Sequence, residues 1–187
     1  YNVKRAVGVP SYRGSLEVAL ADGKLLVVNE LSLEEYLYGV LPSEMPESFG
    51  TEALKAQAVC ARSYACNQLK ANRYRAYGAH VDDSMNCQVY QNYGETAAAV
   101  EAVNATFGKV LSRNGEGITA YYFSCSYGHT ADSYDIWGEN AGTRFEGVLQ
   151  AEGELEDNLK NSKEFAVFLD SDREWYDEES VWFRWNT

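Results

Sequence analysis

One carboxylate in the sequence has a setting typical of an acid catalyst. Glu44 lies in the segment LPSEMP, between Pro42 and Pro46. Because a proline disfavours helical angles in the residue before it, we expect Glu44 in a rigid loop that directs its side chain into a cleft. Partial burial against Met45 and Phe49 would keep this carboxyl protonated near neutral pH, as a general acid requires. The alternative is a solvated turn residue without chemistry.

Two cations are candidates to face this carboxylate. The segment after it has the periodicity of a helix over residues 51–72, and one stripe of that helix carries Lys55 and Arg62. A different face is apolar and rich in alanine, which allows close packing: Leu54, Ala58, Ala61, Ala65 and Gln68.

A second group of polar side chains suggests acyl transfer. Hydroxyls and an imidazole follow one another closely: Tyr122, Ser124, Ser126, His129 and Thr130. However, no glycine pattern of a nucleophile elbow surrounds either serine. Gly128 indicates a turn and favours an exposed His129, so a serine nucleophile is the weaker hypothesis.

The histidines and cysteines do not have the spacing of a metal site. Six residues separate His80 from Cys87, a spacing that matches none of the usual zinc patterns. The sequence also contains no C-x-x-C pair. The other thiols, Cys60, Cys66 and Cys125, are expected to be free and to pack as small apolar side chains. We therefore expect no bound metal.

Composition narrows the function classes. The chain has 187 residues and a net charge of −12, of which −7 falls in residues 151–187. This acidity argues against nucleic acid and anionic membranes as partners, because both select basic surfaces. The 25 aromatic residues predict a folded core. The 14 tyrosines suit stacking on sugar rings, although tyrosine also fills sheet surfaces.

Turn and capping residues predict an α+β fold. Asp22-Gly23 separates two apolar segments and predicts an antiparallel hairpin, and Asn114-Gly115 predicts a second one that continues through GITAYYFSCS. In that second hairpin we expect Tyr121, Phe123 and Cys125 to face the core. Two or three helices should pack on these hairpins, with the Glu44 loop between the first two helices.

The helix boundaries follow from capping signals and periodicity. Ser32 and Glu35 form a capping box that begins the first helix, and the helix over residues 51–72 follows the Glu44 loop. Residues 95–107 predict a third helix. We expect one domain over residues 1–187, made of these successive parts: a hairpin region (1–31), a helix–loop–helix (32–72), a mixed region (73–150) and an acidic segment (151–187).

The residues assembled above resemble a known family. LSLEEYLYGVLPSEMPESFGTEALKAQAVCARSYA, residues 31–65, is similar to the signature stretch of the stage II sporulation protein D family of bacterial cell-wall proteins. Residues 87–90 resemble its C-Q-x-Y segment, and YYFSCSYGHTADSYDIWG resembles its Y-x-S-x-S-x-G-x-T segment followed by a tryptophan. The ending YDEESVWFRW is similar to its C-terminal segment.

The resemblance implies a lytic transglycosylase. Such enzymes cut the β-1,4 bond between N-acetylmuramic acid and N-acetylglucosamine in peptide-stripped glycan strands and leave a 1,6-anhydro sugar. It implies that Glu44 is the catalytic acid and base, without a cofactor. By family position, the residues expected to bind the glycan are Lys55, Gln57, Arg62, Tyr64, Gln88, Tyr90, Ser124, Ser126 and Thr130.

The chain departs from the family pattern at a few positions, and one rival function remains. Phe49 stands where tryptophan is common, and Ser63 where threonine is common. Some relatives look as if they bind zinc before the C-Q segment, but only Cys87 and His80 remain here, so zinc is not carried over. The rival function is a non-catalytic glycan-binding module that enhances a partner amidase.

The resemblance also implies where the protein acts. We expect an extracytoplasmic protein that is secreted or membrane-anchored, with its signal or anchor absent from this chain. Its partners would be peptidoglycan glycan strands and, in addition, a cell-wall amidase or a membrane protein.

Overall fold

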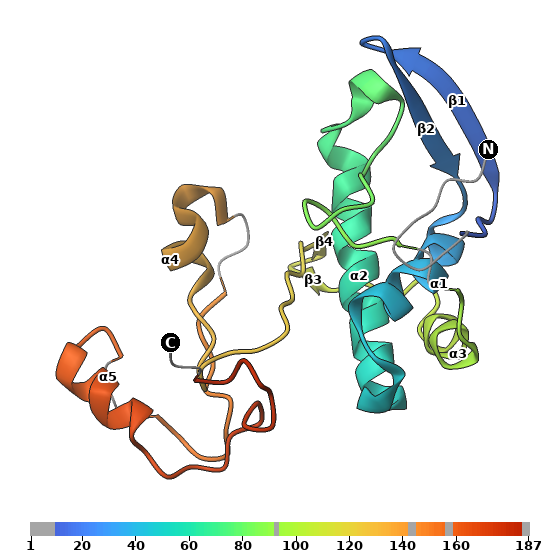
Figure 1. Ribbon diagram of the computed structural model, residues 1–187. Coiled ribbons are helices and arrows are strands. Elements are labelled where there is room, and N and C mark those ends of the chain that lie inside the picture. The colour runs from blue at the N-terminus through green and yellow to red at the C-terminus, as the bar shows by residue number, and fades with distance from the viewer. Residues whose placement is uncertain (1–9, 92–93, 142–144, 156–158, 185–187) are drawn as a thin grey trace. The chain divides into compact units, whose positions relative to one another are not determined.

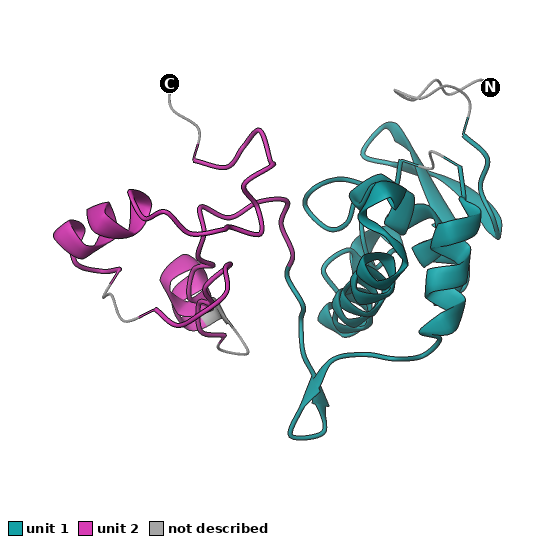
Figure 2. Ribbon diagram, turned by 90° about the horizontal axis from the view of Figure 1, so that it is seen from below, with its two compact units in different colours: residues 1–121 teal, residues 122–187 magenta. Residues whose placement is uncertain are grey.

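The computed structural model describes residues 10–91, 94–141, 145–155 and 159–184 (Figure 1). The chain divides into two compact units, residues 1–121 and residues 122–187 (Figure 2). The first unit holds the predicted carboxylate and the segments that surround it. Each unit has its own buried cluster and is described separately below.

The first unit begins with the predicted hairpin. Strand β1, Ser15–Ala21, pairs antiparallel with β2, Lys24–Glu30. The turn residues Asp22 and Gly23 have φ of 51° and 74°, as an Asp-Gly turn of this type requires. One face of the hairpin is apolar yet more than half exposed: Leu16, Val18, Leu20, Leu25 and Val27.

Helix α1, Leu33–Glu44, begins at the predicted capping box. The Ser32 hydroxyl accepts from the Glu35 backbone, and the Glu35 carboxylate accepts from the Ser32 backbone. The prediction that Glu44 lies in a loop between Pro42 and Pro46 was wrong, because Glu44 is the last residue of α1. Pro42 lies in the last turn, where it removes only one intrahelical hydrogen bond, and the helix continues until Met45 donates to the Leu41 carbonyl.

Three helices form the core of the first unit. After the short 3₁₀ helix η1, Glu47–Phe49, helix α2 runs over Thr51–Ala71, and α3 follows over Ala97–Ala105. The three α-helices pack against one another (Figure 1). Their contact surface is built from the apolar stripes of α1 and α2 and the alanines of α3: Leu37, Val40, Leu41, Leu54, Ala58, Ala61, Ala65, Ala99, Ala102 and Val103.

The second predicted hairpin forms only at its tip. β3, Ser112–Arg113, pairs with β4, Glu116–Gly117, around the positive-φ residues Asn114 and Gly115. The predicted continuation as a strand after residue 117 was wrong. No described strand pairs with it, and Tyr121 and Phe123 are exposed by 47% and 64% instead of facing a core.

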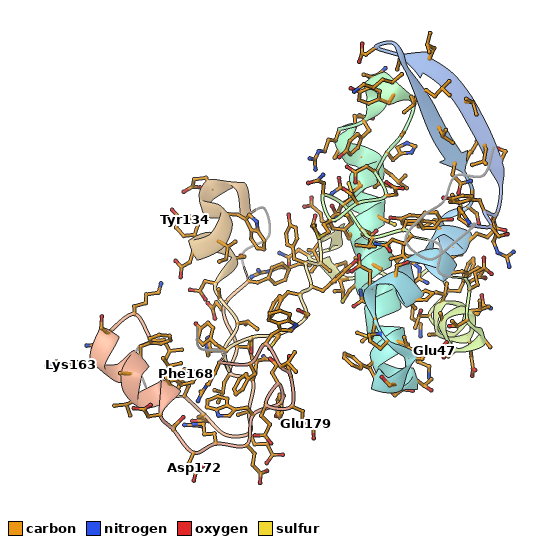
Figure 3. All side chains as sticks on the ribbon, viewed as in Figure 1. Glu47, Tyr134, Lys163, Phe168, Asp172 and Glu179 are labelled. Carbon is orange, nitrogen blue, oxygen red and sulfur yellow. The ribbon has the colours of Figure 1, made fainter. Side chains whose placement is uncertain are left out.

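The second unit contains two helices joined by irregular chain. Helix α4 spans Ser133–Trp137 and is followed by the 3₁₀ helix η3, Gly138–Ala141; α5 spans Ser162–Leu169. Its buried cluster is Phe168, labelled in Figure 3, with Trp175 and Ala151. The Arg184 guanidinium lies 4.3 Å from the Trp175 ring centroid, which closes this cluster on its polar side.

The predicted α+β class is confirmed, with antiparallel hairpins and helices in one chain. A further 3₁₀ turn, η2, spans Arg75–Tyr77. Among the described helices, none combines the length and the apolar character that crossing a membrane requires.

Candidate functional site

Glu44 is the last residue of α1, where the helix meets the connection to α2. Its side chain is half-buried, and Oε1 accepts a hydrogen bond from the backbone N–H of Val89 at 2.6 Å. Within the described part of the chain, Oε2 has no hydrogen-bond partner. One carboxylate oxygen is therefore fixed and the other remains available to an incoming group.

The neighbouring Ser43 holds the same segment in place. Its hydroxyl donates to the Gly39 carbonyl at 2.8 Å and accepts from the Gln91 backbone N–H at 3.3 Å. Two consecutive residues at the end of α1 thus bind the main chain at positions 89 and 91. Glu47, labelled in Figure 3, follows in the connection at the end of the unit opposite to the tip of the β1–β2 hairpin.

Gln88 is one of the predicted glycan-binding residues, and the structure places it inside the unit. It is 1% exposed. Its Nε2 donates to the Ala61 carbonyl at 3.2 Å, and its Oε1 accepts from the Tyr36 hydroxyl at 3.2 Å. The side chain therefore joins α1, α2 and the segment that holds Glu44.

Tyr90 is buried beside Gln88. Its ring stacks on Tyr36 with centroids 5.3 Å apart, and its hydroxyl donates to Asn29 Oδ1 at 3.3 Å. The ring also lies against Gly39 so closely that a Cβ at this position would be 2.5 Å from Tyr90 Cε2. Glycine at position 39 is what allows this approach.

Tyr64 faces the same segment from α2. It is 9% exposed and interacts with the thiol of Cys87, and its ring meets Tyr121 edge-on at 6.4 Å. Burial, together with the neighbouring thiol, raises the pKa of Tyr64 to about 12. The phenol is consequently a hydrogen-bond donor throughout the physiological range.

Gln57 lies on the same side of α2 and differs from Gln88 in one respect. It is 6% exposed, and among the described residues its Nε2 is a buried side-chain atom without a hydrogen-bond partner. A buried amide nitrogen in this state is costly and uncommon.

Arg62 is placed differently from what its stripe on the helix suggested. It is 1% exposed and forms a bidentate pair with Glu34 at the start of α1, with distances of 2.8 and 2.7 Å. Further hydrogen bonds reach the carbonyls of Val103 and Lys109. Lys55 pairs with Glu52 at 2.7 Å on the surface. No contact within residues 10–91 and 94–141 brings either cation to Glu44.

The remaining predicted residues belong to the second unit. Ser126 is buried, and both its N–H and its hydroxyl donate to Asp177 Oδ2, at 2.8 and 2.6 Å. Thr130 Oγ1 accepts from the Val148 backbone at 2.7 Å. Ser124 is exposed. The structure thus groups Glu44, Gln57, Tyr64, Gln88 and Tyr90 in one unit, and these three residues in the other.

Several residues that shape the site could not be singled out in the sequence. The Val89 contact to Glu44 is made by a backbone N–H, a group that nearly every residue has, so the residue type at position 89 does not indicate it. Glu34 resembles an ordinary acidic residue of a first helical turn. Asp177 could have been found, because it lies in the Y-D pair of the C-terminal segment.

Within the described residues, Glu44 belongs neither to a metal-binding cluster nor to the hollow beside α2. In the described ranges, no group of three histidine, cysteine or acidic side chains could hold a metal ion, and all four cysteines are free. A hollow of about 420 Å³ lies between α2 and the β3–β4 hairpin, lined by residues that include Ser63, Cys66 and Lys70. Its lining contains no carboxylate, so it does not supply acid chemistry.

The stretch of sequence that forms this site matches a known protein family. The sequence profile described as "Stage II sporulation protein" matches residues 21–112, which include α1, Glu44, α2 and the segment around Val89. The chain belongs to the stage II sporulation protein D family through this stretch.

Individual relatives agree with this assignment. The chain is 36% identical over 124 residues to stage II sporulation protein D of Bacillus subtilis, covering 59% of this chain and 36% of that protein. It is 41% identical over 104 residues to the amidase enhancer of the same species, covering 56% and 14%. An uncharacterized protein of Brachyspira hyodysenteriae is 37% identical over 128 residues, covering 68% and 34%. The chain thus spans well under half the length of these relatives.

Proposed function

We propose that this chain is a peptidoglycan lytic transglycosylase domain with Glu44 as its single catalytic acid and base. The observation that carries this proposal is the state of the Glu44 carboxylate. Oε1 is held by the Val89 N–H at 2.6 Å, while Oε2 is unpartnered within the described residues. A carboxyl fixed through one oxygen can present the other one to a glycosidic oxygen in a constant direction.

A lone carboxyl is sufficient for this reaction. The protonated Glu44 donates its proton to the glycosidic oxygen as the bond from that oxygen to C1 of N-acetylmuramic acid breaks. The resulting carboxylate then takes the proton of the C6 hydroxyl of the same sugar, whose oxygen bonds to C1. The products are a free 4-hydroxyl and a 1,6-anhydro sugar, and Glu44 ends protonated as it began. Hydrolytic glycosidases, in contrast, need a second carboxylate to activate water or act as nucleophile.

The surrounding residues would divide into two roles. Gln88, Tyr90 and Arg62 are buried and tie the segments together, so we propose that they support the position of Glu44 rather than touch the glycan. Gln57, Tyr64 and Lys55 remain proposed binding residues of the first unit. By family position, Ser124, Ser126 and Thr130 of the second unit are also kept as proposed glycan-binding residues.

The names of the relatives support a role in the cell wall. A sporulation protein and an amidase enhancer at 36% and 41% identity suggest that this chain acts on peptidoglycan outside the cytoplasm, during wall remodelling such as sporulation. The name amidase enhancer also suggests a cell-wall amidase as a partner. It keeps a rival open, namely a module that binds glycan and stimulates that amidase without cleaving the strand itself.

Product analysis separates the two. Peptide-free glycan strands are incubated with the wild type and with the Glu44→Gln variant, and the products are examined by mass spectrometry. We expect 1,6-anhydromuramyl ends with the wild type and a loss of at least ~100-fold with Glu44→Gln, because the transferable proton is gone. Glu47→Gln is the matched control, since Glu47 is exposed in the adjoining connection. Equal product from wild type and Glu44→Gln, or none from either, would refute the catalytic proposal.

A further inference from the structure

Gln57 and Gln88 are a matched pair of buried glutamines in opposite states. Both lie in the first unit, at 6% and 1% exposure. Both polar ends of the Gln88 amide are bonded, to Ala61 and Tyr36. The Gln57 Nε2, in contrast, is the one side-chain nitrogen or oxygen that is both buried and unpaired in the described part of the chain. Such a group destabilises the free protein unless a water or a ligand supplies an acceptor.

The chain that follows Cys87 runs along α2 toward Gln57. Cys87 interacts with Tyr64, and Gln88 bonds to the carbonyl of Ala61, which is nearer to the start of the helix. Gln57 is four residues before Ala61 and therefore lies on the same face, about 6 Å further along the axis.

The next residue of that segment is Val89, which donates to Glu44. The segment therefore contacts α2 through Gln88 and the end of α1 through Val89. The end of α1 reaches the same region, since only residues 45–50 separate Glu44 from the first residue of α2. Gln57 is six residues beyond Thr51, so the unpaired amide lies about 9 Å along α2 from the end of the connection that starts after Glu44.

We propose that the Gln57 amide nitrogen donates a hydrogen bond to the acetamido carbonyl of an N-acetylated sugar bound beside Glu44. The identity of this ligand rests on the proposed function. Among the neutral groups of a glycan strand, the amide carbonyl of the N-acetyl group is the strongest hydrogen-bond acceptor, and an N–H buried in apolar surroundings gains most from such a partner. A site built this way rejects a sugar that lacks the carbonyl, because the amide is then left unpaired again.

Stability and binding must then respond in opposite directions to the loss of the amide. Gln57→Met keeps the length of the side chain and removes the unpaired nitrogen, so its denaturation midpoint should equal or exceed that of the parent. Binding of N-acetylated glycan should weaken about tenfold, which corresponds to one lost hydrogen bond. The matched change Gln88→Met breaks bonds that the free protein already makes, and should lower the denaturation midpoint.

The test measures binding in a protein that does not turn over. Calorimetric titrations compare Glu44→Gln with Glu44→Gln/Gln57→Met, each with peptide-free glycan strands and with the same strands after N-deacetylation. We expect the second protein to bind N-acetylated strands about tenfold more weakly, and the two proteins to bind N-deacetylated strands equally. The amines created by deacetylation affect both proteins alike and cancel in this comparison.

Several results would overturn the inference. These are equal affinities of the two proteins for N-acetylated strands, the same loss on both kinds of strand, or no binding of either protein. Should Gln57→Met fail to fold, Gln57→Leu takes its place in the same two-protein comparison, because the effect of the new amines cancels only between two proteins. A chain that binds with this preference but forms no anhydro ends would lose the proposed catalysis and keep the role of Gln57.

Discussion

The guanidinium of Arg62 in α2 donates two parallel hydrogen bonds to the carboxylate of Glu34 in α1, from Nε to Oε1 at 2.8 Å and from Nη2 to Oε2 at 2.7 Å. The guanidinium is 1% exposed, and its other nitrogen reaches the carbonyl of Lys109 at 3.0 Å. A planar fork with five donors is the side chain suited to such a position. The start of α1 is thereby fixed to α2 and to the chain after α3.

Removing this cation should unfold the first unit more readily. Arg62→Met leaves the Glu34 carboxylate without its partner in a partly buried place, and such a loss costs about 3–5 kcal/mol of unfolding free energy. Urea denaturation measures it. Lys55→Met removes the cation of the exposed pair with Glu52 and should cost less than about 1 kcal/mol. Similar losses for the two variants would contradict a structural role for Arg62.

Gly39 should not tolerate alanine, although it lies in a helix. Alanine normally stabilises a helix interior by about 1 kcal/mol relative to glycine. Here the added Cβ would meet the Tyr90 ring at 2.5 Å, and overpacking costs about 1–3 kcal/mol. We expect a net loss of stability that shrinks in the double variant Gly39→Ala/Tyr90→Leu.

The matched control for this steric effect is Gly117→Ala. A Cβ at that position meets no atom within 4 Å, and its stability should change by less than about 0.5 kcal/mol. Additive effects of the Gly39 and Tyr90 substitutions in chemical denaturation would show that the ring is not the obstacle.

The raised pKa of Tyr64 predicts a loss of stability in alkali. The unfolded phenol titrates near pH 10, whereas burial beside Cys87 raises the pKa of Tyr64 in the folded protein to about 12. Between these values the folded state keeps a proton that the unfolded state releases. The contribution of the Tyr64 proton to the free energy of unfolding is therefore complete below pH 10 and is lost as the pH rises toward 12.

Comparison with Tyr64→Phe isolates this effect. The stability of the variant should fall less steeply than that of the wild type between pH 10 and pH 12, as measured by urea midpoints. Tyr77→Phe, which removes an exposed phenol, controls for the loss of one tyrosine. If the urea midpoints of the wild type and of Tyr64→Phe fell equally with pH, the raised pKa of Tyr64 would not be the cause of the loss of stability.

In the second unit, Asp177 should hold the turn that contains Ser126. Its Oδ2 accepts from both the N–H and the hydroxyl of that serine. Asp177→Asn removes the charge from these bonds, and we expect a loss of about 1–2 kcal/mol. Hydrogen exchange at Ser126 and Gly128 reports it locally. Asp172→Asn, at an exposed position labelled in Figure 3, should leave these amides unchanged; equal exchange in all three proteins would argue against the contact.

Local sequence rules predicted the elements whose cause is itself local. The Asp22-Gly23 turn and the Ser32–Glu35 capping box form as expected, because each depends on residues within one turn of chain. The rule for the residue before a proline holds for Met45, which precedes Pro46 and has extended angles, φ −139° and ψ 127°, but the non-helical segment does not reach back to Glu44. Pro42 has no N–H to donate to the Tyr38 carbonyl, yet the helix continues for two residues beyond it, to Glu44.

Site residues were harder to predict because their roles depend on distant partners. Helical periodicity places Arg62 on one stripe of α2 but does not say which part of the protein that stripe faces. Only the fold shows that the Arg62 guanidinium bonds to Glu34, Val103 and Lys109. Likewise, the sequence contains both Gln57 and Gln88 without any sign that one is paired and the other is not. These distinctions require contacts between segments that are tens of residues apart.

The bond from Val89 to Glu44 has a consequence for how freely the sequence can vary. Its donor is a main-chain N–H, so every residue type except proline at position 89 supplies the same group at the same place. A substitution at position 89 therefore leaves this hydrogen-bond donor in place unless the new residue is proline, which has no N–H.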